Sequence, residues 1–252
     1  MRSAIVLFVC LVFAQSASAQ SKGWIDVNFG TASAAEKSLT TEVNISDGEG
    51  EFETFRVGYN FPRGASFDFG GGFMFSRILG AGIQFTGTAH EDTADFSIRI
   101  PHPLFFNSHA SDSAFTDQKL QRTEGGVNLS LVAALPTNNS SVTVRFYGGP
   151  TYFRLKADVI NDIRYFHQFG FSPSANSVDI TSWTSEEVEE TAWGFHAGAD
   201  LGYFFTNHFG VGGFARVSRG TVTFGTDEYL VDSDIDVKVG GFQAGGGLRI
   251  RF

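Results

Sequence analysis

Cysteine, basic residues and long apolar runs are all scarce in this sequence. The only cysteine, Cys10, lies in an apolar segment at the amino terminus. The rest of the chain therefore has no thiol for a disulfide bond or a thiolate metal site. Lysine and arginine total 18 against 27 aspartates and glutamates, for a formal charge of −9. Such an acidic chain is not expected to bind nucleic acid, because neutralising phosphates needs a basic surface.

The amino-terminal segment has the layout of a secretory signal peptide. A basic residue precedes an apolar run from Ala4 to Ala14, and an A-x-A pattern ends at Ala19. A membrane-spanning helix needs about 20 apolar residues, and this run is shorter. The pattern predicts export with cleavage after Ala19. We therefore predict a signal peptide at residues 1–19 and a single domain at residues 20–252.

Glycine and phenylalanine are abundant, with 30 and 28 residues, and they occur in segments with a period of two. Between Trp193 and Phe205 every odd position is apolar, whereas glycines, His196 and Asp200 fill most even positions. A period of two is typical of a strand with one apolar face. Eight such segments follow one another, at residues 24–29, 67–75, 81–100, 124–135, 142–156, 193–205, 211–218 and 247–252.

The segments and their connections have the lengths expected of a membrane barrel. Most segments are about 10 residues long, which is what a tilted strand needs to cross a bilayer. The connections alternate between short and long. The short ones are residues 75–80, 136–140 and 205–210, and the long ones are 31–66, 101–122, 157–191 and 225–235. We predict an all-β fold: a single antiparallel up-and-down transmembrane β-barrel with short periplasmic turns and long extracellular loops.

The number of strands is eight or ten. Residues 39–45 and 52–61 are themselves strand-like, and the turn-forming residues 47–50 separate them. They form either a hairpin beyond the membrane or two further membrane strands. We expect the hairpin, and hence eight membrane strands, because residues 39–45 have the least apolar outward face and lipid-facing positions tolerate polar groups poorly.

The residues opposite the apolar faces favour a bilayer over a protein core as their surroundings. These opposite faces hold mostly glycine, serine, threonine and asparagine, which suit the interior of a narrow barrel. Acidic residues concentrate in the long connections instead, with 15 of the 27 in residues 36–53, 186–190 and 227–236. A soluble barrel would place charge on its outer face, so we expect the apolar faces to contact lipid.

The carboxy-terminal sequence GGGLRIRF places Leu248, Ile250 and Phe252 at alternate positions. It resembles the last strand of bacterial outer-membrane proteins, which implies recognition by the barrel-assembly machinery. The whole domain resembles the small-barrel family typified by the OmpA transmembrane domain. This resemblance implies the outer membrane of a Gram-negative cell, with the lipid bilayer and lipopolysaccharide as surroundings. A shared fold implies location better than activity. Our leading hypothesis for the function is an envelope-structural or surface-interaction role without enzymatic activity or cofactor.

Seven charged residues fall on the predicted interior faces. We expect them to form a packed network of ion pairs, because an isolated buried charge is very costly. The alternative is a gated pore, which would make the protein a narrow porin-like channel for small solutes. The predicted network consists of Asp26, Asp68, Glu124, Arg145, Asp200, Arg216 and Arg249.

The connection PHPLFFNSH is unusual because Leu104, Phe105 and Phe106 form an apolar cluster within it. This cluster would dip into the lipid headgroups, fold into the barrel mouth, contact a partner, or pack against a neighbouring loop. His102 and His109 flank it without a third ligand nearby, so we predict no metal site there.

Two other polar motifs have simple interpretations. Residues 232–236 (DSDID) alternate acidic side chains but lack the glycine and distal glutamate of a calcium loop, so we interpret them as a solvated acidic tip. Residues 90–92 (HED) place His90 beside two carboxylates without a nucleophile. A barrel enzyme, such as a protease or a lipid-modifying enzyme, is therefore the third hypothesis, and we predict no catalytic residues.

Overall fold

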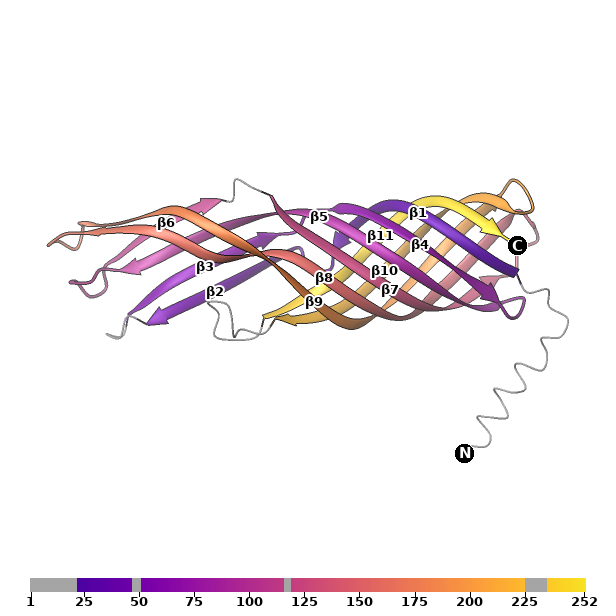
Figure 1. Cartoon of the computed structure of the whole chain (residues 1–252), viewed down its shortest axis with the longest axis horizontal. Helices are drawn as coiled ribbons and strands as arrows, with labels where there is room; N and C mark the ends of the chain where they lie inside the picture. The colour runs from indigo at the N-terminus through magenta and orange to yellow at the C-terminus, as the bar shows by residue number, and fades with distance from the viewer. Residues whose placement is uncertain (1–21, 47–50, 116–118, 225–234) are drawn as a thin grey trace, which may run out of the picture.

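The computed structural model describes residues 22–46, 51–115, 119–224 and 235–252. In these ranges the chain forms eleven β-strands (Figure 1). No helix in the described part is long and apolar enough to cross a membrane. The strands are β1 (Lys22–Ala34), β2 (Ser38–Ser46), β3 (Phe52–Asn60), β4 (Gly64–Met74), β5 (Leu79–Pro101), β6 (His109–Phe115), β7 (Leu120–Leu135), β8 (Val142–Phe169), β9 (Asn176–Phe204), β10 (Phe209–Phe224) and β11 (Ile235–Arg251).

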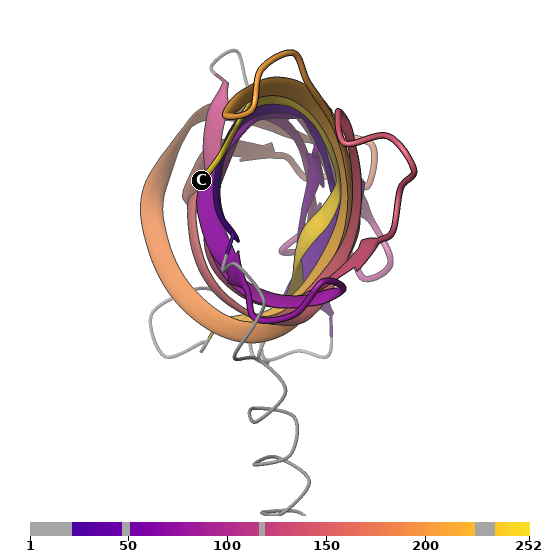
Figure 2. The same cartoon turned by 90° about the vertical axis from the view of Figure 1, so that its right-hand side faces the viewer.

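Eight of these strands close into a ring, seen end-on in Figure 2. Every neighbouring pair is antiparallel, in the order β1, β4, β5, β7, β8, β9, β10, β11 and back to β1. A closed ring leaves no strand edge without a partner, as a bilayer requires. The predicted all-β barrel is confirmed, and so is the choice of eight strands, because β2 and β3 lie outside the ring.

The short turns all lie at one end of the ring, and two of them share a local structure. Ser76 Oγ accepts a hydrogen bond from the Leu79 backbone N–H at 2.9 Å, and Thr206 Oγ1 accepts one from Phe209 at 2.9 Å. In each turn the backbone N–H of the same Ser or Thr also donates to the carbonyl three residues later. The sequences FSRILGAG and FTNHFGVG thus encode the same turn.

In the half of the ring nearest these turns, outward side chains are apolar and inward ones are polar or small. We call this half the barrel section. The outward face agrees with the predicted lipid contact, because a bilayer accepts exposed apolar side chains and water does not. Exposed apolar residues of this face include Phe29, Phe67, Phe85, Leu131, Trp193, Leu201, Phe209 and Leu248.

Beyond the barrel section the strands continue as a second layered unit, which we call the extension. The outer part of β5 pairs with β3 on one side and β6 on the other, and β2 adds to β3. The outer parts of β8 and β9 pack against this four-stranded sheet through an apolar cluster that includes Val57, Phe96, Ile163 and Trp183. A second cluster around Phe55, Ile98 and Val178 lies beside it. Residues 157–191, expected as a loop, are therefore mostly strand.

The inward face of β5 is polar in the barrel section and apolar in the extension, although side chains alternate between the two faces along the whole strand. His90 and Phe96 both point inward and are buried, whereas Ile83 and Phe85 on the same strand point outward and are exposed. Past the membrane the surroundings of the outer face are water, so the apolar side of the strand must face the interior of the extension.

Candidate functional site

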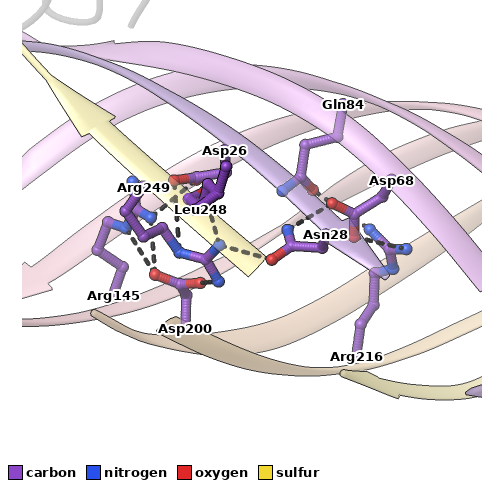
Figure 3. Close-up of polar contacts among 9 residues, drawn as sticks. All are labelled: Asp26, Asn28, Asp68, Gln84, Arg145, Asp200, Arg216, Leu248 and Arg249. Atoms are coloured by element: carbon purple, nitrogen blue, oxygen red, sulfur yellow. Dashed lines mark hydrogen bonds and ion pairs between the residues drawn. The ribbon is translucent and has the colours of Figure 1, made fainter. Parts of the chain in front are cut away.

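Four charged side chains form a closed ring across the interior of the barrel section (Figure 3). Asp26 on β1 and Arg249 on β11 are direct cross-strand neighbours, and so are Arg145 on β8 and Asp200 on β9. Arg145 Nη2 donates to Asp26 Oδ2 at 2.8 Å and to Asp200 Oδ1 at 2.6 Å. Arg249 donates through Nη2 to Asp200, and its Nε lies 3.5 Å from Asp26 Oδ1. Each arginine therefore contacts both aspartates.

This four-charge ring connects opposite walls of the barrel. In the order of the strands, β1 and β8 are as far apart as two of the eight can be, yet Arg145 reaches Asp26. All four side chains are almost fully buried. Two positive and two negative charges balance, so the ring carries no net charge into the low-dielectric interior.

A second charged group adjoins the four-charge ring on the side of the extension. Asp68 Oδ1 accepts from Asn28 Nδ2 at 2.6 Å, and Asp68 Oδ2 lies 3.4 Å from Arg216 Nη2. Arg216 Nε donates to Gln243 Oε1 at 3.0 Å, and Arg249 Nη1 donates to Asn28 Oδ1 at 2.5 Å. Asn28 therefore joins this group to the four-charge ring, and six of the seven predicted interior charges form one network.

The seventh predicted charge, Glu124, lies apart from this network. Its partner is Arg122, which was not among the predicted interior charges: Arg122 Nη2 donates to Glu124 Oε1 at 2.7 Å. Glu124 Oε2 also accepts from the Gly240 backbone N–H at 2.7 Å. The guanidinium of Arg122 lies 4.3 Å from the centre of the Phe61 ring. Arg122 shares the inward parity of Glu124, two residues away, so the period of two identifies it in retrospect.

A chain of neutral polar side chains crosses the same interior, and no sequence pattern indicated that these side chains contact one another. His196 contacts Ser130 Oγ through Nε2 and Thr151 Oγ1 through Nδ1, each at 2.8 Å, and Thr151 Oγ1 donates to Asn128 Oδ1 at 2.7 Å. A cavity of about 20 Å³ lies between this chain and the four-charge ring. That volume holds about one water molecule.

Apolar layers lie on both sides of the polar interior. Toward the turns, Trp24 packs with Val132 and Tyr147, and the ring of Trp24 also lies under the Arg145 guanidinium at 5.1 Å. Toward the extension, a five-residue cluster of Phe153, Leu155, Val222, Val237 and Val239 is buried. Along its axis, the interior is therefore filled by apolar, charged and again apolar side chains.

The first two residues of the HED motif, His90 and Glu91, lie on opposite faces of β5. His90 points inward, with Nδ1 at 3.0 Å from the carbonyl oxygen of Pro62. Glu91 points outward and pairs with Lys119. Among the described residues, no three metal-binding side chains are grouped so as to hold an ion.

The apolar cluster of the PHPLFFNSH connection lies at the end of the extension farthest from the barrel section (Figure 1). Leu104 and Phe106 are exposed in the turn between β5 and β6. Phe105 packs edge-on against the His102 ring at 4.9 Å, and His102 in turn contacts Phe169 of β8 at 5.9 Å. Of the four placements considered, insertion into the surrounding headgroups and folding into the barrel mouth do not fit this position.

The remaining predicted positions lie at two other places in the chain. Leu248 and Phe252 are exposed on the outward face of the last strand, together with the half-buried Ile250. The backbone of Phe252 exchanges hydrogen bonds of 2.8 and 3.0 Å with Gly23, which joins the two ends of the barrel. The predicted signal peptide, and residues 232–234 of the DSDID motif, lie outside the described residues.

Nearly the whole chain matches one family model. Residues 3–249 match the family model described as the outer membrane protein beta-barrel domain. The attachment invasion locus protein Ail of Yersinia pestis, solved with the heparin analogue sucrose octasulfate, is 14% identical. That alignment covers 92% of this chain and all of Ail, with a TM-score of 0.40. Neisserial surface protein A is 10% identical over 92% of this chain and 96% of its own, with a TM-score of 0.44. No curated protein matches the chain.

Proposed function

Because the chain belongs to the outer membrane protein β-barrel family and lies in the cell outer membrane, we propose that it is a closed, non-enzymatic barrel whose function is contact at the cell surface. The contact is made by the extension, on the side of the membrane opposite the short periplasmic turns. The observation that carries this proposal is that the extension has an apolar core of its own.

The length of the strands supports a role for the extension. A strand of about 10 residues is enough to cross a bilayer, whereas β8 and β9 have 28 and 29 residues. Their outer parts are fixed by packing against β3 and β5 and by specific bonds, such as the Ile160 backbone N–H donating to the Tyr59 hydroxyl at 3.0 Å. A rigid surface far above the membrane serves contact better than it serves transport.

The filled interior supports the closed state over the channel. An open pore needs a continuous path wide enough for its solute, but Arg145 connects opposite walls and apolar clusters lie above and below it. Eight-stranded barrels have an interior that side chains can fill. The charged network thus acts as a structural plug in this proposal.

Conductance of the mature protein in a planar lipid bilayer tests whether the barrel is closed. We expect no discrete openings from inserted wild-type protein. Openings that become larger in the Arg145→Ala variant would contradict the proposal and would mean that the interior charges gate a pore.

Adhesion of living cells tests the contact function. Ile160 and Ser185 are cross-strand partners, so a two-residue Asn-Gly turn can replace residues 161–184. Cells that display the wild type should attach to cultured animal cells or to one another more strongly than cells with this truncation. A folded barrel migrates differently on a detergent gel before and after boiling. The amount of this folded form must be equal in both strains. Equal attachment would contradict the contact function.

The outer rim of the barrel section also supports our proposal that lipopolysaccharide surrounds it. The rings of Tyr152 and Trp193 contact each other at 5.2 Å at this rim. The exposed Arg154 and Arg219 and the half-buried Lys156 follow on the same strands or the neighbouring one, and Arg154 and Lys156 are also paired with Glu189 and Glu187. Aromatic residues typically lie at the membrane interface, and cations beside them suit phosphate groups. Recognition of the last strand by the barrel-assembly machinery is likewise a proposal, which rests on Leu248, Ile250 and Phe252.

A further inference from the structure

Two hairpin ends at the far end of the extension contain no formally charged residue. They are residues 100–111, between β5 and β6, and residues 165–178, between β8 and β9. Neither contains an Asp, Glu, Lys or Arg, although these residues make up 18% of the chain. Both hairpin ends reach farther from the barrel section than the described ends of β2 and β3 do (Figure 1). We call these two hairpin ends the distal tip.

The distal tip presents large apolar side chains to solvent. Phe106 is 69% exposed in the first hairpin and Phe171 is 95% exposed in the second. Large apolar side chains at such exposure on neighbouring loops are uncommon in a soluble surface and mark a site of interaction. The exposed apolar residues of the distal tip are Leu104, Phe106, Phe166, Phe169 and Phe171.

The first turn holds its apolar side chains outward through a network of hydrogen bonds. His102 Nδ1 accepts from the Leu104 backbone N–H at 3.0 Å, and the His102 N–H donates to the Ser108 carbonyl at 2.7 Å. Asn107 has a φ of 61°, in the left-handed region, and its N–H donates to Glu51 at 2.8 Å. The Leu104 and Phe106 side chains thus project from an ordered turn.

The two hairpins are joined to each other, so their apolar residues act together. Ser108 Oγ donates to the Pro173 carbonyl at 2.8 Å, and the His102 ring contacts Phe169. The four exposed phenylalanines of these two linked hairpins can enter a soft, uncharged layer without a shaped receptor. A protein partner would instead have to supply a matching concave pocket for each ring.

The position of the distal tip excludes the membrane that holds the barrel. Pro101 lies 11 residues beyond the inward-facing His90 on β5, or about 36 Å along the strand at ~3.3 Å per residue. The charged residues bonded to the distal tip are acidic as well as basic. Glu51 and Glu53 accept hydrogen bonds from Asn107 and Tyr165, and Arg99 contacts the His109 ring. An anionic surface is therefore not favoured over a neutral one.

We propose that the distal tip inserts into the interfacial layer of a second, zwitterionic lipid bilayer that faces the outer membrane. This inference rests on the contact function proposed above and names its partner. Phe106 and Phe171 enter the headgroup–acyl boundary, and no charged side chain has to be desolvated when they do. Glu51 and the linked turns keep both rings pointed at that surface.

Flotation of the protein with lipid vesicles tests the inference. The wild-type protein is reconstituted in nanodiscs and mixed with phosphatidylcholine vesicles, and the bound fraction is measured after flotation. We expect the Phe106→Ser/Phe171→Ser variant to bind at least about tenfold more weakly, because it loses most of the inserted apolar surface. The matched control is Phe115→Ser, which removes a 79% exposed ring of β6 outside the distal tip and should leave binding unchanged.

A fluorescent probe reports insertion directly. A Phe171→Trp side chain should shift its emission to the blue on mixing with phosphatidylcholine vesicles and should be quenched by brominated lipid, whereas Phe115→Trp should show neither change. Adding phosphatidylglycerol to the vesicles should not strengthen binding. Absence of wild-type binding to phosphatidylcholine, or binding that requires the anionic lipid, would overturn the inference.

The adhesion assay separates failure of this inference from failure of the proposed function. The truncation of residues 161–184 could abolish attachment of cells although the wild-type protein does not bind vesicles. In that case the contact function stands and its partner is a protein or glycan. If that truncation leaves attachment unchanged, the contact function itself fails, whatever the vesicles show.

Discussion

Arg145 and Asp200 face each other across the β8–β9 pair, and Arg145 donates two hydrogen bonds to the same Asp200 oxygen, from Nη2 at 2.6 Å and from Nε at 3.2 Å. Asp26 is the third member of this arrangement, on the opposite wall. A direct cross-strand pair would form in any flat sheet with this register. The contact between Arg145 and Asp26 exists only because the sheet closes into a barrel. Loss of this contact would therefore be a sign that the barrel is not closed.

The Arg145→Met variant should lose stability by about 3–5 kcal/mol, the usual cost of removing one partner from a buried ion pair. The four-charge ring would then carry a net negative charge in a low-dielectric interior. The measurement is the free energy of unfolding in urea, with the protein in lipid vesicles.

Two further variants make this prediction specific. The Arg145→Met/Asp26→Asn double variant restores a neutral ring and should recover part of the lost stability. The Arg154→Met variant breaks an exposed pair with Glu189 and should change stability little, because water replaces that partner. If the two single variants have the same effect, then charge burial is not what stabilises the interior.

The barrel could be predicted from the sequence because its strands, and the face on which each residue lies, follow from local sequence patterns. Strand parity follows from a period of two, and the inward position of Asp26 or Arg145 follows from parity alone. The pairing of these residues across the interior could not be predicted, because it depends on ring closure and strand tilt. His196 and Ser130 gave no signal, since a neutral polar residue among glycines fits any narrow interior.

The extension was the harder part to predict. A period of two identifies which residues share a face, but not whether that face meets lipid, water or protein. Ile83 faces outward and Phe96 faces inward on one strand, and only the length of β5, 23 residues, shows that part of it lies beyond the bilayer. Residues 157–191 contain many charged residues, which favoured a loop, yet their inward positions alternate well enough to build a core.

Gly241 should not tolerate a side chain. It has a φ of 125°, in the region that L-residues rarely adopt, and a Cβ there would lie 1.9 Å from the Ser33 carbonyl oxygen. The Gly241→Ala variant should therefore lose about 1–3 kcal/mol and yield less of the band that changes migration on boiling. Gly87→Ala is the control, because nothing lies within 4 Å of its added Cβ, and an equal loss there would show that the backbone at Gly241 is not the cause.

The extension should weaken in strong alkali through Tyr59. Burial raises the pKa of the Tyr59 hydroxyl to about 12 from its ordinary value of 10.0. Because the folded-state pKa is the higher one, the stabilisation is complete below pH 10 and is lost as the pH rises toward 12. The phenolate absorbance of wild type minus that of Tyr59→Phe isolates this titration. A difference spectrum with its midpoint near pH 10 would show that Tyr59 is accessible to water.

The extension should unfold without the barrel when its core is opened. Phe96 is buried between the two layers and contacts the Trp183 ring edge-on at 6.3 Å. The Phe96→Ala variant should cost the extension about 3–5 kcal/mol, because it removes a ring from a packed core and leaves a cavity.

Two probes distinguish the two parts of the molecule. Trp183 emission should shift to the red and a protease should cut within residues 157–191, because these depend on packing against Phe96. Migration of the unboiled barrel should stay unchanged, because the eight-stranded ring below His90 keeps all its pairs. The matched variant is Phe85→Ala on the same strand, whose ring is exposed to lipid and whose loss should leave both Trp183 and the protease pattern as in the wild type. Loss of the folded barrel band in Phe96→Ala would mean that the two parts fold as one cooperative unit.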